Sequence, residues 1–338
     1  MFSFAENSLY VEALDLWIDS MRPRERCYVS HGHSDHAREH TTVVTSVNNA
    51  KICEWRFARR EERRQQSLFE RTPKRPRCTF ETHAFNESWE LGGHRLTLFS
   101  AGHVLGSAQL MIEGERGSFV YTGDFKLEPS YTAEAPEVKR CDVVLMECTY
   151  GRPHYVFPPR AEVAAQMVSF AKETLEHDAI PVFFAYSLGK AQEAIAILGN
   201  GGIPVTAHGA VHAISQLYEA AGVAMPPYAR YDAKTYDGLR ALVWPPGGSL
   251  PKPAKERTMR TAILTGWSID RGMEFRYGAD RGFPLSDHAD YPSLLRYIEL
   301  AQPRKVLLNH GWRDFVYRLR AAGVDAEYLE ANAQLSLF

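Results

Sequence analysis

The sequence lacks the features that mark membrane, secreted and strongly charged proteins. Its 338 residues contain no apolar run long enough to span a bilayer, and the first residues have neither the basic start nor the apolar core of a signal peptide. The formal net charge is only −2, which does not by itself indicate a nucleic-acid partner, although a local basic patch fits that balance. These absences leave a globular chain of one large domain or two smaller ones.

Cysteine is scarce. The five cysteines are odd in number and form no C-x-x-C pair, so we expect free thiols in a reducing compartment and a cytoplasmic protein without a membrane partner. The cysteines are Cys27, Cys53, Cys78, Cys141 and Cys148.

One short segment is unusually rich in metal-ligating side chains: His31-Gly32-His33-Ser34-Asp35-His36. His31 and His33 are two apart, so on an extended segment they point the same way. Asp35 and His36 are adjacent and point apart, which suits a second ion or a turn into a helix that we expect to begin at residues 37–40. The pattern predicts metal binding, with a histidine-rich polar loop as the alternative.

Further strands end in similar residues. Apolar or β-branched runs at 90–100, 118–121 and 143–146 are each followed closely by an imidazole or a carboxylate next to Gly or Thr. Because such groups gather where strand ends converge, we expect them to line one pocket. These residues are His103, Asp124 and Glu147. Helices and strands then alternate from residue 160 to about 206, which predicts a small parallel-sheet domain.

Taken in order, the motifs resemble those of the metallo-β-lactamase-fold nucleases of the β-CASP branch, and most closely those of the bacterial ligase-associated DNA exonucleases. Artemis and the mRNA 3′-end cleavage factor belong to the same branch. The motifs are Asp19, the His31–His36 segment, Gly102-His103, Gly123-Asp124, Glu147-Cys148-Thr149-Tyr150-Gly151, Ser286-Asp287-His288-Ala289-Asp290 and Asn309-His310-Gly311.

The resemblance implies an α/β protein with an αββα metallo-β-lactamase sandwich and a small inserted β-CASP-type α/β domain. The sandwich would comprise residues 1–155 and 258–330, the insertion residues 156–257, and a C-terminal tail residues 331–338.

The resemblance also implies two divalent ions, Zn²⁺ or Mn²⁺. One would be held by His31, His33 and His103, and the other by Asp35, His36 and His310, with Asp124 as the bridge. Asp19 would orient these ligands from behind.

The same resemblance implies the catalytic residues. Asp35 and Asp124 count among them as metal ligands. His288 would donate to the phosphate or act as a general acid, and Glu147 would fix the tautomer of His288. A structural helix-capping role is the alternative for His288.

A basic stretch follows the first motif. The pattern of residues 48–68 predicts a helix, which carries Arg59, Arg60, Arg63 and Arg64. These arginines either pair with neighbouring glutamates on a solvated face or contact the DNA backbone. Lys126, just past Asp124, is a further candidate phosphate contact.

The final residues resemble a sliding-clamp docking peptide. Gln334, Leu335, Leu337 and Phe338 would make the contacts, and packing of the tail on its own domain is the alternative.

The expected function is a metal-dependent DNA exonuclease, 5′ to 3′, in DNA repair alongside an ATP-dependent DNA ligase and a helicase. The main alternative is an RNase or RNA 3′-end-processing nuclease with the same metals. A small-molecule hydrolase of the glyoxalase or lactonase type and a non-enzymatic metal-binding scaffold are the remaining alternatives.

Overall fold

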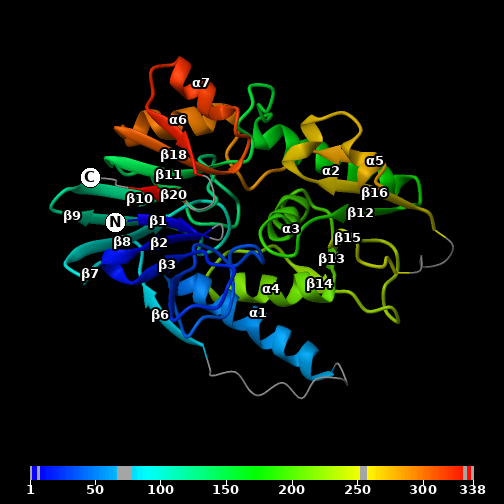
Figure 1. Cartoon of the computed structure of the whole chain (residues 1–338). Coiled ribbons are helices and arrows are strands. Elements are labelled where there is room, and N and C mark those ends of the chain that lie inside the picture. Colours follow the sequence, from blue (N-terminus) through cyan, green and yellow to red (C-terminus); the bar gives the residue numbers. More distant parts are fainter. Residues whose placement is uncertain (1, 6–7, 67–77, 252–256, 330–332, 336–338) are drawn as a thin grey trace. The chain divides into compact units, whose positions relative to one another are not determined.

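The protein is described here from a computed structural model, covering residues 2–5, 8–66, 78–251, 257–329 and 333–335. The chain divides into two compact units, which Figure 1 colours along the sequence. The first unit comprises Met1–Glu128, Glu134–Arg152 and Tyr291–Phe338, and the second Pro129–Ala133 and Pro153–Asp290. In the described part of the chain, no helix is both long and apolar enough to cross a membrane.

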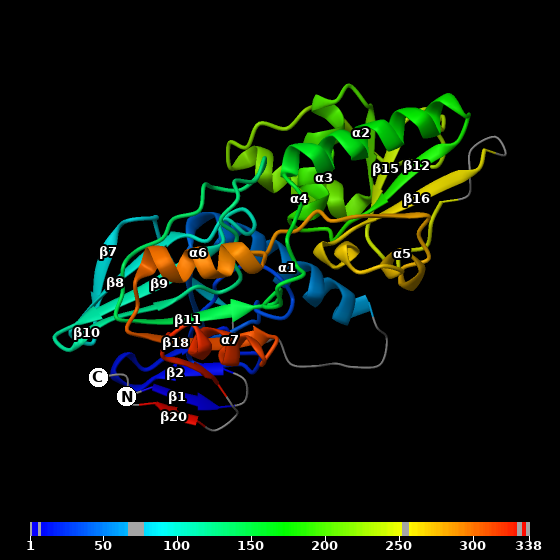
Figure 2. The ribbon, with the colours of Figure 1, turned by 90° about the horizontal axis from the view of Figure 1, so that it is seen from above.

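The first unit contains two seven-stranded sheets, seen as separate layers in Figure 2. One sheet has the order β20-β1-β2-β3-β4-β5-β6, with β1 (Phe2–Ala5), β2 (Ser8–Val11), β3 (Leu16–Ile18), β4 (Arg26–Tyr28), β5 (Thr42–Ser46), β6 (Thr79–His83) and β20 (Ala333–Leu335). The other has the order β19-β18-β11-β10-β9-β8-β7, with β7 (Ser88–Leu91), β8 (His94–Ser100), β9 (Ala108–Gly114), β10 (Gly117–Tyr121), β11 (Val143–Cys148), β18 (Lys305–Gly311) and β19 (Ala326–Tyr328). The turn η1 (Glu12–Leu14) joins β2 to β3.

Alternating apolar residues hold the two sheets together. Leu16 and Ile18 of β3 point to one face because they are two apart on a strand, and both are buried in a core shared with Leu98, Leu110 and Leu145 of the facing sheet. Burial of such side chains contributes about 1.5–3 kcal/mol each, which makes this core the main source of stability for the unit.

Helices cover the outer faces. The helix α1 (Val47–Gln66) packs on β5 and β6, with Phe57 in a cluster that includes Val43. On the other sheet, the Tyr297 ring of α6 (Tyr291–Ala301) lies 4.7 Å from that of Phe125, and its hydroxyl donates to Gln109 Oε1 at 2.6 Å. The helix α7 (Phe315–Ala321) packs on β19. The expected αββα sandwich is therefore confirmed.

The second unit is built on a six-stranded sheet in which every pairing is parallel, in the order β14-β13-β15-β12-β16-β17. The strands are β12 (Ile180–Phe184), β13 (Val205–Ala207), β14 (Tyr228–Arg230), β15 (Ala241–Trp244), β16 (Met259–Leu264) and β17 (Arg281–Phe283). The helices are α2 (Arg160–Glu176), α3 (Lys190–Asn200), α4 (Gly209–Ala220) and α5 (Met273–Arg276), with the short η3 (Gly266–Ile269). This is the small α/β domain that the alternation predicts.

The insertion ends later than the predicted boundary at residue 257. Strand β16 pairs in parallel with β12, and β17 pairs with β16, so both belong to the second unit, which continues to Asp290. Leu264 and Phe283 pack in the same buried cluster as Phe183. The sequence of an apolar strand such as β16 is compatible with a sheet of either unit. Only its pairing with distant strands shows to which unit it belongs. His288 therefore belongs to the second unit.

The described part of the predicted tail is the strand β20. In β20, Leu335 pairs with Phe2 and Gln334 with Ser3 of β1, in antiparallel register. This pairing agrees with the alternative that the tail packs on its own domain. Leu337 and Phe338 lie outside the described residues.

A local irregularity places His310. The register of β11 against β18 shifts between Glu147 and Cys148, and His310 has a positive φ of 46°. Gly311 follows with φ of 151°, and a Cβ added there would overlap the carbonyl of Cys148. Glycine is required at this position because the two strands approach each other too closely for a side chain.

We predict that Gly311→Ala lowers the free energy of unfolding by at least about 2 kcal/mol, from backbone strain combined with the clash. Gly93→Ala is the matched control, because Gly93 has φ of 75° with no atom within 4 Å of an added Cβ. It should cost only about 1 kcal/mol. Urea unfolding measures both losses, and equal losses would contradict the steric account.

Candidate metal centre

The histidine-rich segment follows β4 as a short turn. Val29 N donates to Val44 O at 3.0 Å, and both His36 N and Ala37 N donate to His33 O. The helix expected at residues 37–40 is wrong, because the chain leaves this single turn and runs directly into β5. A turn suffices to place His31, His33 and His36 on one side of the strand end.

Four side chains gather tightly. His31, His33, His103 and Asp124 each offer one ligand atom, and these atoms all lie within 4.8 Å of one another. Asp124 Oδ2 is 3.5 Å from His31 Nε2 and 3.9 Å from His103 Nε2. His103 Nε2 lies 3.0 Å from His33 Nδ1. The structure thus brings together the residues predicted for one ion and the predicted bridge.

Of the residues predicted for a second ion, His36 approaches the same Asp124 oxygen as His31 and His103. His36 Nε2 is 3.5 Å from Asp124 Oδ2, and the His36 and His310 rings are 5.3 Å apart. His310 and Asp35 are both exposed, and neither belongs to the four-residue group found among the described residues. One oxygen of Asp124 therefore lies near imidazoles from both predicted sets, and its role as a bridge stays a prediction.

Asp19 orients the cluster from behind. Its Oδ1 accepts a hydrogen bond from Ser30 N at 2.7 Å, and its Oδ2 accepts from Ser30 Oγ at 2.6 Å, from His36 Nδ1 at 2.8 Å and from Tyr121 Oη at 2.8 Å. Since His36 donates to Asp19 through Nδ1, its Nε2 is the nitrogen that faces Asp124.

Ser30 does the same for His31. Its hydroxyl donates to Asp19 and lies 3.0 Å from His31 Nδ1, so it accepts from that nitrogen and leaves Nε2 for a ligand role. Sequence reasoning missed Ser30 and Tyr121, because neither belongs to a ligand motif. The only available signal was that Ser30 immediately precedes His31.

Electrostatics of the cluster favour a positive charge at its centre. Burial lowers the pKa of His36, but Asp124 and Asp19 outweigh it and raise the pKa to about 10. Burial, followed by the charge of Asp19, raises the pKa of Tyr121 well above its usual value and keeps that hydroxyl a donor.

The donor set fits a divalent cation. Imidazole nitrogens and carboxylate oxygens are the ligands that Zn²⁺ and Mn²⁺ accept. The hydrogen bonds that His36 and His31 donate to Asp19 and Ser30 fix the rings, as the outer partners of metal-bound histidines do. His31, His33, His103 and Asp124 could hold one ion. His36 and His310, with Asp35 nearby in sequence, could hold a second.

Glu147 supports the loop that carries Asp124. It is buried, its Oε1 accepts from Phe125 N at 2.9 Å, and its Oε2 accepts from Thr149 Oγ1. In the second unit, His288 N donates to Ser286 Oγ at 3.0 Å, and its Nε2 is 3.8 Å from Asp287 Oδ1. The predicted pairing of Glu147 with His288 stays a prediction.

The candidate DNA contacts differ in exposure. Lys126 is only 3% exposed, which does not match a contact on an open surface. Arg60 donates to Ala37 O at 3.2 Å, and the Arg59 guanidinium lies 5.4 Å from the Trp55 ring. Arg63 and Arg64 are in α1, but their side chains lie outside the described part of the structure.

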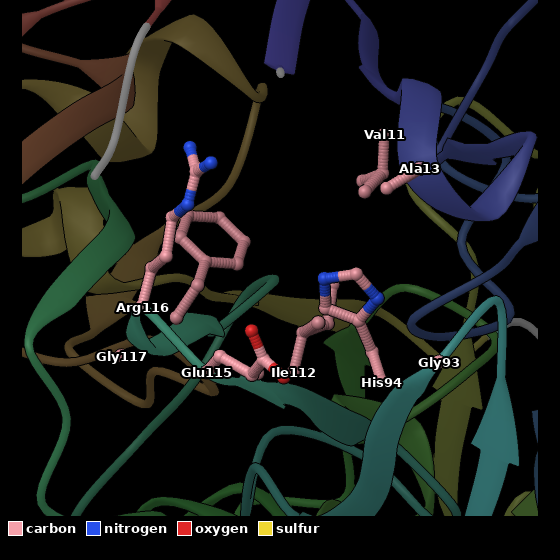
Figure 3. A pocket seen from close by; sticks show the side chains of 10 residues that line it. Val11, Ala13, Gly93, His94, Ile112, Glu115, Arg116 and Gly117 are labelled. Carbon is pink, nitrogen blue, oxygen red and sulfur yellow. The ribbon is translucent and has the colours of Figure 1, made fainter.

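A separate cavity of about 390 Å³ lies in the first unit, and Figure 3 shows its lining, which includes Val11, His94, Ile112, Arg116 and Phe119. His94 begins β8 and Gly117 begins β10, whereas the metal candidates follow the ends of these strands. The cavity is therefore distinct from the candidate metal centre.

Comparison with known families gives two matches along the chain. Residues 18–182 match the beta-lactamase superfamily domain, and residues 282–333 match the Zn-dependent metallo-hydrolase RNA specificity domain. The chain belongs to the β-CASP metallo-hydrolase family. A crystal structure of a protein of unknown function from Enterococcus faecalis shares this β-CASP fold, with a TM-score of 0.62, 15% identity and coverage of 91% of this chain and 80% of that chain.

The curated relatives are longer proteins. A probable DNA ligase of Opitutus terrae is 38% identical over 98% of this chain and 31% of its own length. An RNase J-like protein of Methanocaldococcus jannaschii is 25% identical over 65% of this chain and 64% of its own. Cleavage and polyadenylation specificity factor subunit 3 of Dictyostelium discoideum is 37% identical over 34% of this chain and 15% of its own. The β-CASP chain thus spans less than two thirds of each.

We predict that Asp19→Asn weakens Zn²⁺ binding about 10–100-fold, because His36 and Ser30 lose the carboxylate that orients them. Competition with a chromophoric chelator measures the affinity. Tyr121→Phe removes a single donor to Asp19 and should weaken binding less. Unchanged affinity in Asp19→Asn would refute the orienting role.

Proposed function

We propose that this chain is a metal-dependent DNA exonuclease that hydrolyses phosphodiester bonds from 5′ to 3′ with two ions, Zn²⁺ or Mn²⁺, in DNA repair. The observation that carries the proposal is the gathering of His31, His36 and His103 around the Asp124 carboxylate in a β-CASP chain. Two-ion sites of imidazoles and carboxylates are typical of phosphodiester hydrolysis.

Each side chain has a defined task in the proposal. His31, His33 and His103 would hold one ion, Asp35, His36 and His310 would hold the other, and Asp124 would serve both. When bound, the ions withdraw charge from a phosphate oxygen and favour attack by water. Asp19 keeps the imidazole lone pairs directed at the site, and Glu147 holds the loop of Asp124. His288 donates a proton to the leaving oxygen.

DNA is supported over RNA by a relative with which nearly the whole chain aligns. That Opitutus protein is named a probable DNA ligase, and 98% of this chain aligns with it. The name of this relative supports the proposal that a DNA ligase is the partner. A helicase partner and clamp docking through Gln334, Leu335, Leu337 and Phe338 complete the proposal, the latter requiring β20 to leave β1.

RNA cleavage is the second candidate function. Residues 282–333 match a domain described by RNA specificity, and the Methanocaldococcus and Dictyostelium relatives carry names from RNA processing. The metal residues are the same for both substrates, so only the substrate contacts would differ. Arg59, Arg60, Arg63 and Arg64 are the proposed backbone contacts for either strand.

We predict that the protein, loaded with Mn²⁺ or Zn²⁺, degrades end-labelled DNA and leaves the matched RNA oligonucleotide largely intact. Asp124→Asn should lower cleavage by more than about 100-fold, since even residues behind metal ligands change activity 10–100-fold. Gel analysis of products from 5′- and 3′-labelled strands gives the polarity. Preferred cleavage of RNA would establish the second function instead, and no cleavage with Mn²⁺, Zn²⁺ or Mg²⁺ would overturn both.

We predict that His288→Ala lowers the single-turnover rate about 10²–10⁴-fold, as expected for loss of a general acid, while bound metal stays at the wild-type level. His103→Ala is the contrasting variant, because it should lose metal together with activity. Elemental analysis and single-turnover cleavage distinguish the two. A wild-type rate in His288→Ala would assign this residue a structural role.

A further inference from the structure

The second unit buries a group of charged side chains that the sheet itself does not need. Arg160, Lys190, Glu193 and Asp287 are 8%, 7%, 2% and 2% exposed. Arg160 begins α2, Lys190 and Glu193 lie one turn apart on α3, and Asp287 precedes His288. Buried charges are costly unless they are paired, so the pairs that they form require an explanation.

These pairs converge on the segment that carries His288. Lys190 Nζ donates to Asp287 Oδ1. Arg160 pairs with Glu193 through Nη1, and its Nη2 donates to the backbone oxygen of Ser286 at 2.8 Å. The two residues that precede His288 are thus held, one by its side chain and the other by its backbone.

The segment continues this pattern up to His288. Ser286 Oγ accepts from His288 N at 3.0 Å and donates to His288 O at 3.1 Å, which closes a tight turn. Asp290 Oδ2 accepts from Phe157 N at 3.1 Å on the far side of the histidine. Hydrogen bonds on both sides of His288 restrict the backbone that presents its ring.

Glu193 links this segment to another part of the chain. Its Oε1 accepts from Ser130 Oγ at 3.1 Å and from Tyr131 N at 3.3 Å. Residues 130 and 131 follow the loop of Asp124 in sequence. One carboxylate therefore fixes both the guanidinium that holds Ser286 and the chain that leaves the Asp124 loop.

We propose that Arg160 and Lys190, through Glu193 and Asp287, are positioning residues that hold the 285–290 segment and thereby place the His288 ring. The consequence for catalysis rests on the proposed nuclease function. A guanidinium suits this task because its planar fork binds a carboxylate and a carbonyl at once, which an ammonium or an apolar side chain does not.

Arg160→Lys tests the proposal, because it keeps the charge that faces Glu193 and removes the second donor group. In the metal-loaded protein, amide hydrogen exchange at residues 286–290 should become at least about 10-fold faster. Turnover should fall about 100-fold with KM within about twofold of wild type, as expected for a misplaced catalytic group. Lys190→Met should act in the same direction, and Lys190→Arg should restore both readouts.

Gln192→Met is the matched control. Gln192 is fully buried on α3 between Lys190 and Glu193, and its Nε2 donates to Ser187 O and Ser215 Oγ, each at 3.1 Å. This variant should lower the melting temperature but leave exchange at residues 286–290 and turnover unchanged. An equal loss of turnover would mean that general destabilisation explains the effect and would overturn the proposal.

Two further outcomes would overturn it. If amide hydrogen exchange at residues 286–290 is unchanged in Arg160→Lys, the network does not restrict this segment. If exchange is faster but turnover stays at the wild-type level, the restriction of the segment does not position His288 for catalysis. Failure of the proposed nuclease function can be told apart from failure of this proposal. A wild-type protein that cleaves no nucleic acid still gives a measurable amide exchange rate at residues 286–290. That rate decides whether the network positions His288.

Discussion

The hydrogen bonds accepted by Asp19 determine how the candidate metal centre is arranged. An imidazole has two nitrogens and can rotate, so a cluster of histidines does not define a site until one nitrogen of each ring is committed. Asp19 commits His36 directly and His31 through Ser30. It lies at the end of β3 with a positive φ of 46°, a conformation that a non-glycine residue adopts only where its surroundings stabilise it.

The sandwich supplies the precision that these hydrogen bonds need. The candidates come from strand ends far apart in sequence, after β4, β8 and β10 and within β18, and they meet because facing sheets align their ends. A close-packed interior does not deform continuously, so a carboxylate such as Asp124 stays within 3.5–3.9 Å of three imidazoles. The bulge at His310 adds a local adjustment that regular pairing would not allow.

The sequence predicts the ligand candidates better than their surroundings. Residue type and spacing predict His31 and His33 as ligands, and the positions of His103 and Asp124 after strands predict these two. All of these signals are local in the sequence. Ser30, Tyr121 and Arg160 carry no such signal, since their importance depends on contacts with residues far away in the chain. For the same reason, sequence patterns alone place residues 258–290 in the sandwich and do not predict the burial of Lys126.

The network around Arg160 is better explained by geometry than by stability. Replacing buried ion pairs with apolar side chains of similar volume is often neutral or stabilising, so four buried charges do not make this unit more stable than an apolar core would. Apolar contacts are non-directional, however, and would not satisfy or orient a backbone carbonyl such as that of Ser286. A directional donor fixes it. Because α2 supplies Arg160 and α3 supplies Lys190 and Glu193, the hydrogen bonds to the segment that bears His288 depend on the positions of both helices.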